Sequence, residues 1–351
     1  MSGPLHETSA AAGLRQLLRA DGVIGDAATL TPLSGGVSSE IYLVRNGDAQ
    51  FVVKRALAQL KVAEPWFADV GRNRNEANYL RYVSSFRPQN VPRLDYVSRE
   101  NGYFCMEYLG QGWKNWKQSL LDGDFDPQVA IDVADFLGAV HAHSSGDPEA
   151  RVQFDTLNEF EQLRIEPYLL ATARRHPALK DVIEGAAERL RLRRDVLVHG
   201  DFSPKNMLVG PRGVAVVDCE VAWYGDAAFD VAFLLNHLLL KSLLHPSRSE
   251  ALQAMAASAW SSYLNARFAG AKEAGDAVLA RNTGELLLLL LLARVDGKSP
   301  VEYLSDAHRD YVRTFAVKRL DGSLTTVEQV AEEWFQTLRA STTQPIGSQI
   351  A

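Results

Sequence analysis

Residues 198–230, VHGDFSPKNMLVGPRGVAVVDCEVAWYGDAAFD, place proton-handling and metal-binding side chains at fixed spacings. Phosphoryl transfer from ATP needs a carboxylate that orients an attacking hydroxyl, and oxygen ligands that hold Mg²⁺ against the triphosphate. This segment can supply both kinds of group from four residues, which are Asp201, Asn206, Asp218 and Glu220.

A short strand is predicted immediately before the second pair of acids. The apolar run 214–217 reads VAVV, and it leads directly into Asp218. Because side chains of a strand alternate between its faces, continued alternation places Asp218 and Glu220 on one face and Cys219 on the other. We expect the two carboxylates to share a metal ion.

The motif HGD at residues 199–201, followed by Asn206, resembles the catalytic loop of the aminoglycoside phosphotransferase and choline kinase superfamily, small-molecule relatives of the protein kinases. The motif DCE at 218–220 stands where that family carries its metal-binding acids. The run EVAWYG at 220–225, with Phe229 and Asp230 behind it, is similar to methylthioribose kinases, although those enzymes usually differ at the asparagine position. The resemblance implies an α+β, bilobal protein-kinase-like fold, with a small N-terminal antiparallel β-sheet lobe and a larger, mostly helical C-terminal lobe.

The same resemblance implies a role for each polar residue of the segment. Asp201 is expected to orient or deprotonate the acceptor hydroxyl, while Asn206, Asp218 and Glu220 are expected to hold Mg²⁺. Two residues are expected to support the loop without touching substrate, His199 by fixing its conformation and Asp230 by accepting backbone N–H bonds, since a buried carboxylate needs partners.

A β-hairpin is predicted near the N-terminus. Two alternating apolar runs, residues 33–45 and 49–54, flank the turn NGD at 46–48, and Asn-Gly between such runs is a strong hairpin signal. The preceding segment SGGVSS, residues 34–39, resembles the family's nucleotide loop, so its glycines and serines are expected to contact phosphates through backbone N–H groups and hydroxyls. The residues concerned are Gly35, Gly36, Ser38 and Ser39.

Lys54 ends this hairpin and matches the family's phosphate-contacting lysine. Glu76 is the only acid within residues 72–86, a segment with apolar residues at helical spacing, so we expect a Lys54–Glu76 ion pair. Two further strands are expected at 94–97 and 103–106. The second leads to the sequence EYLG, which resembles the hinge between the lobes, where Glu107 and Leu109 would bind adenine through their backbone.

After residue 112 helical periodicity replaces strand periodicity, in segments such as 126–145, 157–176 and 181–194. The predicted organisation is a nucleotide-binding lobe over residues 1–108, a helical lobe with the substrate site over 109–340, and a disordered tail over 341–351. At 351 residues, two lobes agree with usual domain sizes.

Composition excludes several classes of protein. A net charge of −6 argues against a nucleic-acid-binding protein. The run of leucines at 286–292 ends at Arg294, too short for a membrane span of roughly 18–20 residues, and predicts a buried helix.

No secretory signal precedes the first strand, and Cys105 and Cys219 fit reduced core residues, so we expect a cytoplasmic protein. The oligomeric state stays open between monomer and homodimer.

The acceptor is the least defined part of the prediction. Aromatic and polar residues near the metal segment, or isolated in apolar helices, are candidates for substrate contact, although a buried polar network explains them equally well. They are Trp223, Tyr224, Asn236, His237, Arg294 and Asp296.

These features predict an enzyme that moves the γ-phosphoryl group of ATP, with Mg²⁺, to a hydroxyl of a small molecule such as an aminoglycoside, a sugar such as methylthioribose, or an amino alcohol. Three alternatives belong to other classes. The first is a catalytically silent nucleotide-binding pseudokinase, which the intact set of candidate residues opposes. The second is a metal-dependent hydrolase that uses His199, with His141 and His143 as the nearest candidate ligands. The third is a sugar-binding module, which leaves Lys54 and Glu76 without a function.

Overall fold

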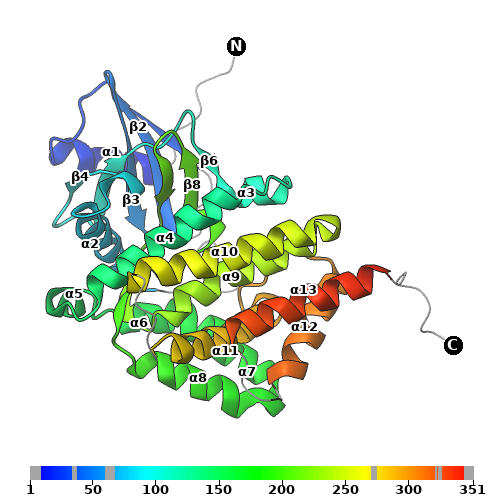
Figure 1. Ribbon diagram of the computed structural model, residues 1–351. Helices are drawn as coiled ribbons and strands as arrows, with labels where there is room; N and C mark the ends of the chain where they lie inside the picture. Colours follow the sequence, from blue (N-terminus) through cyan, green and yellow to red (C-terminus); the bar gives the residue numbers. More distant parts are fainter. Residues whose placement is uncertain are drawn as a thin grey trace. The chain divides into compact units, whose positions relative to one another are not determined.

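An antiparallel sheet forms most of the N-terminal part of the chain in the computed structural model (Figure 1). The structure describes residues 9–33, 38–59, 68–269, 275–320, 322 and 326–343. The chain divides into two units, Met1–Gln111 and Gly112–Ala351. The predicted boundary after residue 108 lies close to this division.

The sheet of the first unit has five strands in the order β1-β2-β3-β5-β4. The predicted hairpin is present, because β2 and β3 pair from Ser39↔Ala56 to Asn46↔Ala49, and Gly47 takes a φ of 61° in the turn. Strand β5 pairs with β3 on one side and β4 on the other. The strands are β1 (Thr29–Pro32), β2 (Ser39–Asn46), β3 (Ala49–Ala56), β4 (Leu94–Val97) and β5 (Tyr103–Glu107).

Strand alternation separates an apolar face of this sheet from a charged one. Leu14 and Leu18 of α1 (Ser9–Ala20) pack with Val53 and Cys105 in one buried cluster. Lys54 follows Val53 along β3 and therefore faces the other way, toward α2 (Arg72–Ser84). The helix α1 was not predicted, although its amphipathic pattern is clear once the sheet is known.

Short strands of the second unit carry the two loops of the segment 198–230. Strand β7 (Val196–Val198) pairs with β10 (Trp223–Gly225), and β8 (Met207–Gly210) pairs with β6 (Lys114–Asn115) and β9 (Gly213–Val216). The loop 199–206 connects β7 to β8, and the loop 217–222 connects β9 to β10.

Helices make up the rest of the second unit, and the long ones pack along one another. Helices α4 and α10 lie side by side (Figure 1), and α11 contacts α9, α12 and α13. The leucines at 286–292 are buried in α11, as predicted for a helix that is apolar on all sides. These helices are α3 (Trp116–Leu121), α4 (Pro127–Ser144), α5 (Pro148–Gln153), α6 (Leu157–Phe160), α7 (Ala171–Arg175), α8 (Lys180–Leu192), α9 (Ala228–Ser242), α10 (Ser249–Phe268), α11 (Gly275–Asp296), α12 (Asp306–Leu320) and α13 (Val327–Thr343).

Two helix predictions need correction. The segment 157–176 is not one α-helix, because the π-helical stretch Glu161–Leu170 separates α6 from α7. Pro167 inside this stretch has no N–H group for the regular α-helical ladder. The tail was predicted to begin at residue 341, but α13 continues to Thr343.

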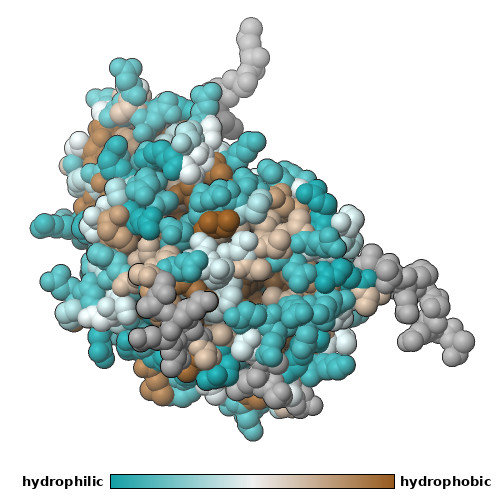
Figure 2. All heavy atoms as spheres, in the orientation of Figure 1, coloured by the Kyte–Doolittle hydropathy of each residue, from teal (hydrophilic) through white to brown (hydrophobic). Residues whose placement is uncertain are grey.

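The described surface and helices agree with the predictions from composition. Both cysteines are free and buried, as predicted. The face shown in Figure 2 is mostly hydrophilic, with apolar side chains scattered among polar ones. Among the described residues, no helix combines the length and the apolar character needed to cross a membrane.

Candidate active site

The loop between β7 and β8 is held in place by Asp230 of α9. This fully buried carboxylate accepts hydrogen bonds from the backbone N–H groups of His199 at 2.6 Å and of Gly200 at 2.9 Å. Gly200 has a φ of 78°, in the left-handed region that glycine adopts without a side-chain clash. The two bonds are the backbone contacts expected of Asp230.

His199 uses both ring nitrogens inside the protein. Its Nδ1 accepts the N–H of Asp201 at 3.1 Å, so Nε2 carries the proton and donates to the carbonyl of Val217 at 3.2 Å. Burial lowers the pKa of His199 and keeps the ring neutral. His199 therefore fixes the loop. This geometry opposes the hydrolase alternative, as does the separation of its other candidates, since His141 is buried and His143 is exposed.

Asp201 lies between two cations. Its Oδ2 is 3.1 Å from Nη2 of Arg164 and 2.9 Å from Nζ of Lys205, and the residue is 6% exposed. Burial alone would raise the pKa of Asp201, but Lys205 and Arg164 outweigh it and hold that pKa well below its usual value. The carboxylate is therefore ionised at physiological pH and can accept a hydrogen bond from a hydroxyl.

The sequence patterns did not reveal Arg164. It lies in the π-helical stretch, a kind of segment often found at functional sites, and its Nε also donates to the carbonyl of Gly200. In the sequence, Arg164 stands between the apolar residues Leu163 and Ile165 of a predicted helix, and in the structure all three are buried.

Three oxygen donors near Asp201 suit a hard divalent cation. The amide nitrogen of Asn206 donates to the backbone carbonyl of Asp201 at 2.9 Å, which leaves its amide oxygen as the atom for a cation. Carboxylate oxygens of Asp218 and Glu220 lie within 4.8 Å of each other. Arg164 interacts electrostatically with Asp201, Asp218 and Glu220, so these groups converge on one region. Mg²⁺ prefers such oxygen ligands.

The reason why Asp218 and Glu220 meet differs from the prediction. Strand β9 ends at Val216, and Asp218 takes a φ of 63°, so strand alternation does not continue through Glu220. A left-handed aspartate costs roughly 1–2 kcal/mol, and such backbone conformations cluster at functional sites. A turn, not a strand face, brings the two carboxylates together.

In the first unit, Lys54 of β3 and Glu76 of α2 form the expected ion pair. The Nζ to Oε2 distance is 2.5 Å, and the side chains are 2% and 1% exposed. A charge pair this deeply buried must hold a fixed geometry, because neither partner can turn to water.

Replacing Glu76 with glutamine is expected to lower the free energy of unfolding by about 3–5 kcal/mol, because the buried ammonium of Lys54 loses its carboxylate. Urea denaturation measures this change. Glu184→Gln is the matched control, since its pair with Lys180 is 3.9 Å long and about half exposed. A Glu76→Gln variant as stable as the control would contradict a structural ion pair.

The Phosphotransferase enzyme family matches residues 29–270, well over half of the chain and including Lys54, Glu76 and both loops. The chain belongs to this family. The match covers parts of both units, since it runs from β1 in the first unit to α10 in the second.

Curated relatives of this chain include methylthioribose kinases. The one from Yersinia pseudotuberculosis serotype O:3 (strain YPIII) is 25% identical over 266 residues, which cover 67% of this chain and 65% of that protein. The one from Pectobacterium atrosepticum is 26% identical over 236 residues, covering 58% and 59%. The chain thus spans about 65% of the length of the first of these relatives.

Solved structures show the fold. A choline kinase from Cryptosporidium parvum Iowa II superposes with a TM-score of 0.57 at 12% identity, covering 95% of this chain and 99% of that chain. An amicoumacin kinase, solved with AMP-PNP, Ca²⁺ and amicoumacin, superposes with a TM-score of 0.56 at 15% identity, covering 93% and 100%. The chain therefore has the predicted α+β, kinase-like fold.

The predicted nucleotide loop lies partly outside the described residues, which do not include Gly35 and Gly36. Ser38 and Ser39 are buried at the start of β2. Arg72, which is fully buried, holds this end of the loop by donating to the carbonyl of Ser38 at 2.6 Å. It also donates to the carbonyls of Leu57 and Ala68, which flank the undescribed segment 60–67.

Glu107 and Leu109, the predicted adenine contacts, lie at the end of the first unit. Glu107 ends β5, and its backbone N–H donates to the carbonyl of Arg93 at 2.8 Å. Leu109 follows in an irregular, partly buried segment before the unit ends at Gln111.

Trp223 and Tyr224 are structural residues of the core, and this corrects their prediction as substrate contacts. Trp223 is fully buried and stacks on Phe160 with ring centroids 4.4 Å apart. The hydroxyl of Tyr224 donates to the carbonyl of Ser144 at 2.8 Å and accepts the N–H of Gly146 at 3.0 Å. Both side chains face the core because β10 packs between helices.

Asp296 also has a structural role in place of the predicted one. It accepts two hydrogen bonds from Arg313 of α12, each of 2.8 Å, and one from His176 at 2.8 Å. Asn236 is fully buried in α9, and its amide atoms have no hydrogen-bond partner among the described residues. Within the described part of the chain, no hydrogen bond or ion pair joins either residue to Asp201.

His237 and Arg294, in contrast, lie near Asp201. Nη1 of Arg294 donates to the hydroxyl of Tyr168 at 3.1 Å, and the guanidinium of Arg164 lies 5.6 Å from the same Tyr168 ring. Burial lowers the pKa of His237 well below its usual value, and Arg294 adds to this effect. Both residues therefore remain candidates for contact with the acceptor.

Lys241, one helical turn beyond His237, was not predicted and is unusual. Its side chain is 1% exposed, and burial lowers its pKa to about 7, with Lys117 and Arg294 adding to the effect. In the described part of the chain no carboxylate forms an ion pair with its ammonium. The ring of Tyr303 lies 4.9 Å from its Nζ, and the carboxylate of Glu302 partly offsets the lowering of its pKa.

Lys241→Met is expected to stabilise the protein most at low pH. Lys241 loses its proton near pH 7 in the folded protein and near pH 10.5 in the unfolded chain. Between these two pH values the unfolded state binds more protons than the folded state. The unfolding free energy of the wild type therefore rises with pH over this range. Since one pKa unit corresponds to about 1.4 kcal/mol, the unfolding free energy of the variant is expected to exceed that of the wild type by a few kcal/mol near pH 6 and by little near pH 10. Denaturation at several pH values tests this, with exposed Lys180→Met as control. Parallel pH profiles for wild type and Lys241→Met would contradict it.

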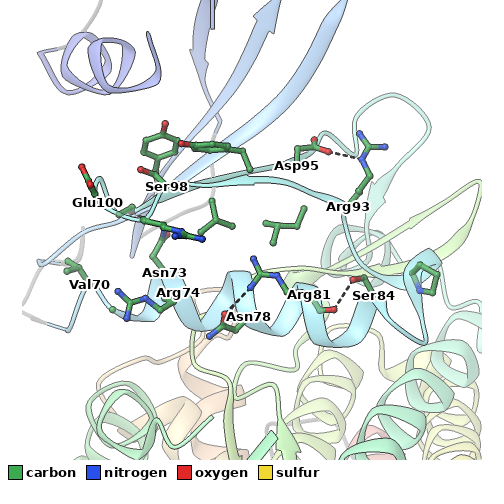
Figure 3. A pocket seen from close by; sticks show the side chains of 18 residues that line it. Val70, Asn73, Arg74, Asn78, Arg81, Ser84, Arg93, Asp95, Ser98 and Glu100 are labelled. Atoms are coloured by element: carbon green, nitrogen blue, oxygen red, sulfur yellow. Dashed lines mark hydrogen bonds and ion pairs between the residues drawn. The ribbon is translucent and has the colours of Figure 1, made fainter. Parts of the chain in front are cut away.

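A cavity of about 1010 Å³ in the first unit lies away from all predicted site residues (Figure 3). It is open between α2 and the β4–β5 hairpin, and Arg74, Arg81 and Arg93 line it. Arg93 pairs with Asp95 at 2.7 Å, and Arg81 donates to Asn78 at 3.3 Å (Figure 3). Arg93 and Arg81 are therefore partnered within the chain, and the proposed chemistry does not use this cavity.

Proposed function

We propose that this chain transfers the γ-phosphoryl group of ATP, with Mg²⁺, to a hydroxyl of a small molecule. The observation that carries the proposal is Asp201, a buried and ionised carboxylate on a rigid loop, in the same region as the oxygen donors Asn206, Asp218 and Glu220. Phosphoryl transfer depends mainly on positioning and charge stabilisation, which this arrangement supplies.

Asp201 would accept a hydrogen bond from the acceptor hydroxyl and align its oxygen for attack. Its lowered pKa makes it a weak base at first. This suits a loose transition state, in which the hydroxyl proton leaves late. Lys205, which is half exposed at its side chain, would move from Asp201 toward the transferred phosphoryl group.

Asn206, Asp218 and Glu220 would hold Mg²⁺, which when bound neutralises charge on the phosphate oxygens. Their amide and carboxylate oxygens match the ligand preference of that ion. Lys54, fixed by Glu76, would contact the phosphates, and the backbone of residues 107–109 would meet the adenine. Gly35, Gly36, Ser38 and Ser39 remain the proposed nucleotide loop.

The relatives support kinase chemistry, since the curated matches are methylthioribose kinases. A structural neighbour was solved with a nucleoside triphosphate analogue and a divalent cation. The acceptor itself is a proposal: the relatives' substrates are methylthioribose, choline and amicoumacin, and each differs in charge and size.

Acceptor-dependent ADP production tests the proposal. The purified chain is incubated with ATP and Mg²⁺ and a panel of sugars, sugar acids, sugar phosphates, amino alcohols and aminoglycosides. At least one acceptor is expected to raise ADP release well above the rate in water, and Asp201→Asn is expected to abolish that increase. Nucleotide binding without any acceptor-dependent ADP would instead identify a pseudokinase.

A further inference from the structure

We infer that the acceptor is an anionic hydroxy compound, whose carboxylate or phosphate group is bound by Lys241 and Arg294 while its hydroxyl lies at Asp201. This inference rests on the proposed function and names its substrate class. All residues that carry it belong to the second unit.

One face of α9 connects the two ends of this site. Phe233, His237 and Lys241 recur every four residues, so their side chains follow one stripe of the helix. At 1.5 Å per residue the stripe is about 12 Å long. Its first member lies 5.8 Å from the guanidinium of Arg164, which pairs with Asp201.

A second path of contacts joins the same ends. The guanidinium of Arg164 lies 5.6 Å from the centre of the Tyr168 ring, and that of Arg294 lies 5.7 Å from the same ring. Arg294 also interacts electrostatically with Lys241. Asp201 also interacts electrostatically with His237. Contacts through Arg164, Tyr168 and Arg294 therefore link the catalytic carboxylate to the surroundings of Lys241.

This region lacks the negative charge that its cations require. Lys241 takes part in no ion pair within the described residues, and its Nζ lies 4.9 Å from the ring of Tyr303. Nε of Arg294 has no hydrogen-bond partner there. The ring nitrogens of His237, which is 7% exposed, likewise make no hydrogen bond in the described part of the chain. The nearby Glu302 is already paired with Lys117. A buried unpaired charge raises the free energy of the folded protein. A bound anion that pairs with these cations would therefore lower that free energy.

The same charges disfavour the acceptors of several family members. A cation placed along this stripe would meet Arg164, Arg294 and Lys241 in a poorly hydrated environment, where like charges repel strongly. Protein sites discriminate by such unfavourable contacts as well as by favourable ones. Choline and aminoglycosides, which are cationic, are therefore expected to be poor acceptors.

Matched acceptor pairs test this inference at saturating ATP and Mg²⁺. Ribose is compared with ribose 5-phosphate, glycerol with glycerate and with glycerol 3-phosphate, and choline represents cations. We expect kcat/KM for an anionic member to exceed that of its neutral partner by about tenfold or more, equal to about 1.4 kcal/mol. The phosphate and carboxylate arms show which anion is preferred.

Variants locate the effect. Lys241→Met is expected to raise KM for the anionic acceptor about tenfold or more and to remove its advantage over the neutral one, while the exposed Lys180→Met keeps that advantage. Since Lys241→Met is expected to be stable, its loss of discrimination does not reflect unfolding. A neutral or cationic acceptor with the highest Asp201-dependent kcat/KM would overturn the inference and leave the proposed function intact. ADP release that is insensitive to Asp201→Asn would overturn the proposed function itself.

Discussion

Asp201→Asn is expected to lower kcat by about 10³–10⁴-fold, with ATP binding largely retained. The amide keeps the shape of the side chain but cannot accept the hydroxyl proton and offers Arg164 and Lys205 no charge. ATP binding persists because Lys54, Asn206 and Asp218 are unchanged. Steady-state ADP release and equilibrium titration with ATP measure the two quantities separately.

Asp195→Asn is the matched control, since Asp195 lies just before β7, pairs with Arg193 at 2.8 Å and is 37% exposed. Its kcat is expected to match that of the wild type. Circular dichroism confirms that each variant is folded. If Asp201→Asn turned over as fast as Asp195→Asn, another residue would have to orient the acceptor.

Gly200→Ala is expected to destabilise the protein by roughly 2–5 kcal/mol and to lower kcat strongly. Gly200 has a φ of 78°, which costs a side-chain-bearing residue about 1–2 kcal/mol. A Cβ there would also lie 2.5 Å from the carbonyl oxygen of Val221. Relief of this clash costs about 1–3 kcal/mol more and separates the Asp201 loop from the loop that carries Glu220.

Gly213→Ala isolates the backbone contribution. Gly213 has a φ of 93°, but a Cβ there meets no atom within 4 Å. We expect this control to lose only about 1–2 kcal/mol and to keep its kcat. Thermal and urea denaturation with steady-state kinetics compare the two variants, and equal effects in both would show that the contact between the loops is unimportant.

The parts of the site that depend on short segments could be predicted from the sequence. The hairpin turn at Gly47 follows from a local pattern. The pairing of Lys54 with Glu76 was expected from the resemblance to the kinase family, with Glu76 the only acid in its segment. The loop that holds Asp201 and Asn206 was also expected from that resemblance.

The rest depends on contacts between distant segments, which local patterns do not encode. Arg164 reaches Asp201 through a π-helical stretch that periodicity represents as an ordinary helix. Asp218 meets Glu220 through a left-handed turn where alternation predicts a strand. Lys241 looks like a typical surface lysine at the end of an apolar helix, and only its burial among other cations reveals it.

Phosphorus NMR of the reaction products tests the central claim most directly. With ATP, Mg²⁺ and the best acceptor of the panel, we predict one new phosphate monoester signal for each ADP formed, and no such signal with Asp201→Asn. Formation of ADP with inorganic phosphate alone, whichever hydroxylated compound is present, would contradict transfer to a small-molecule hydroxyl.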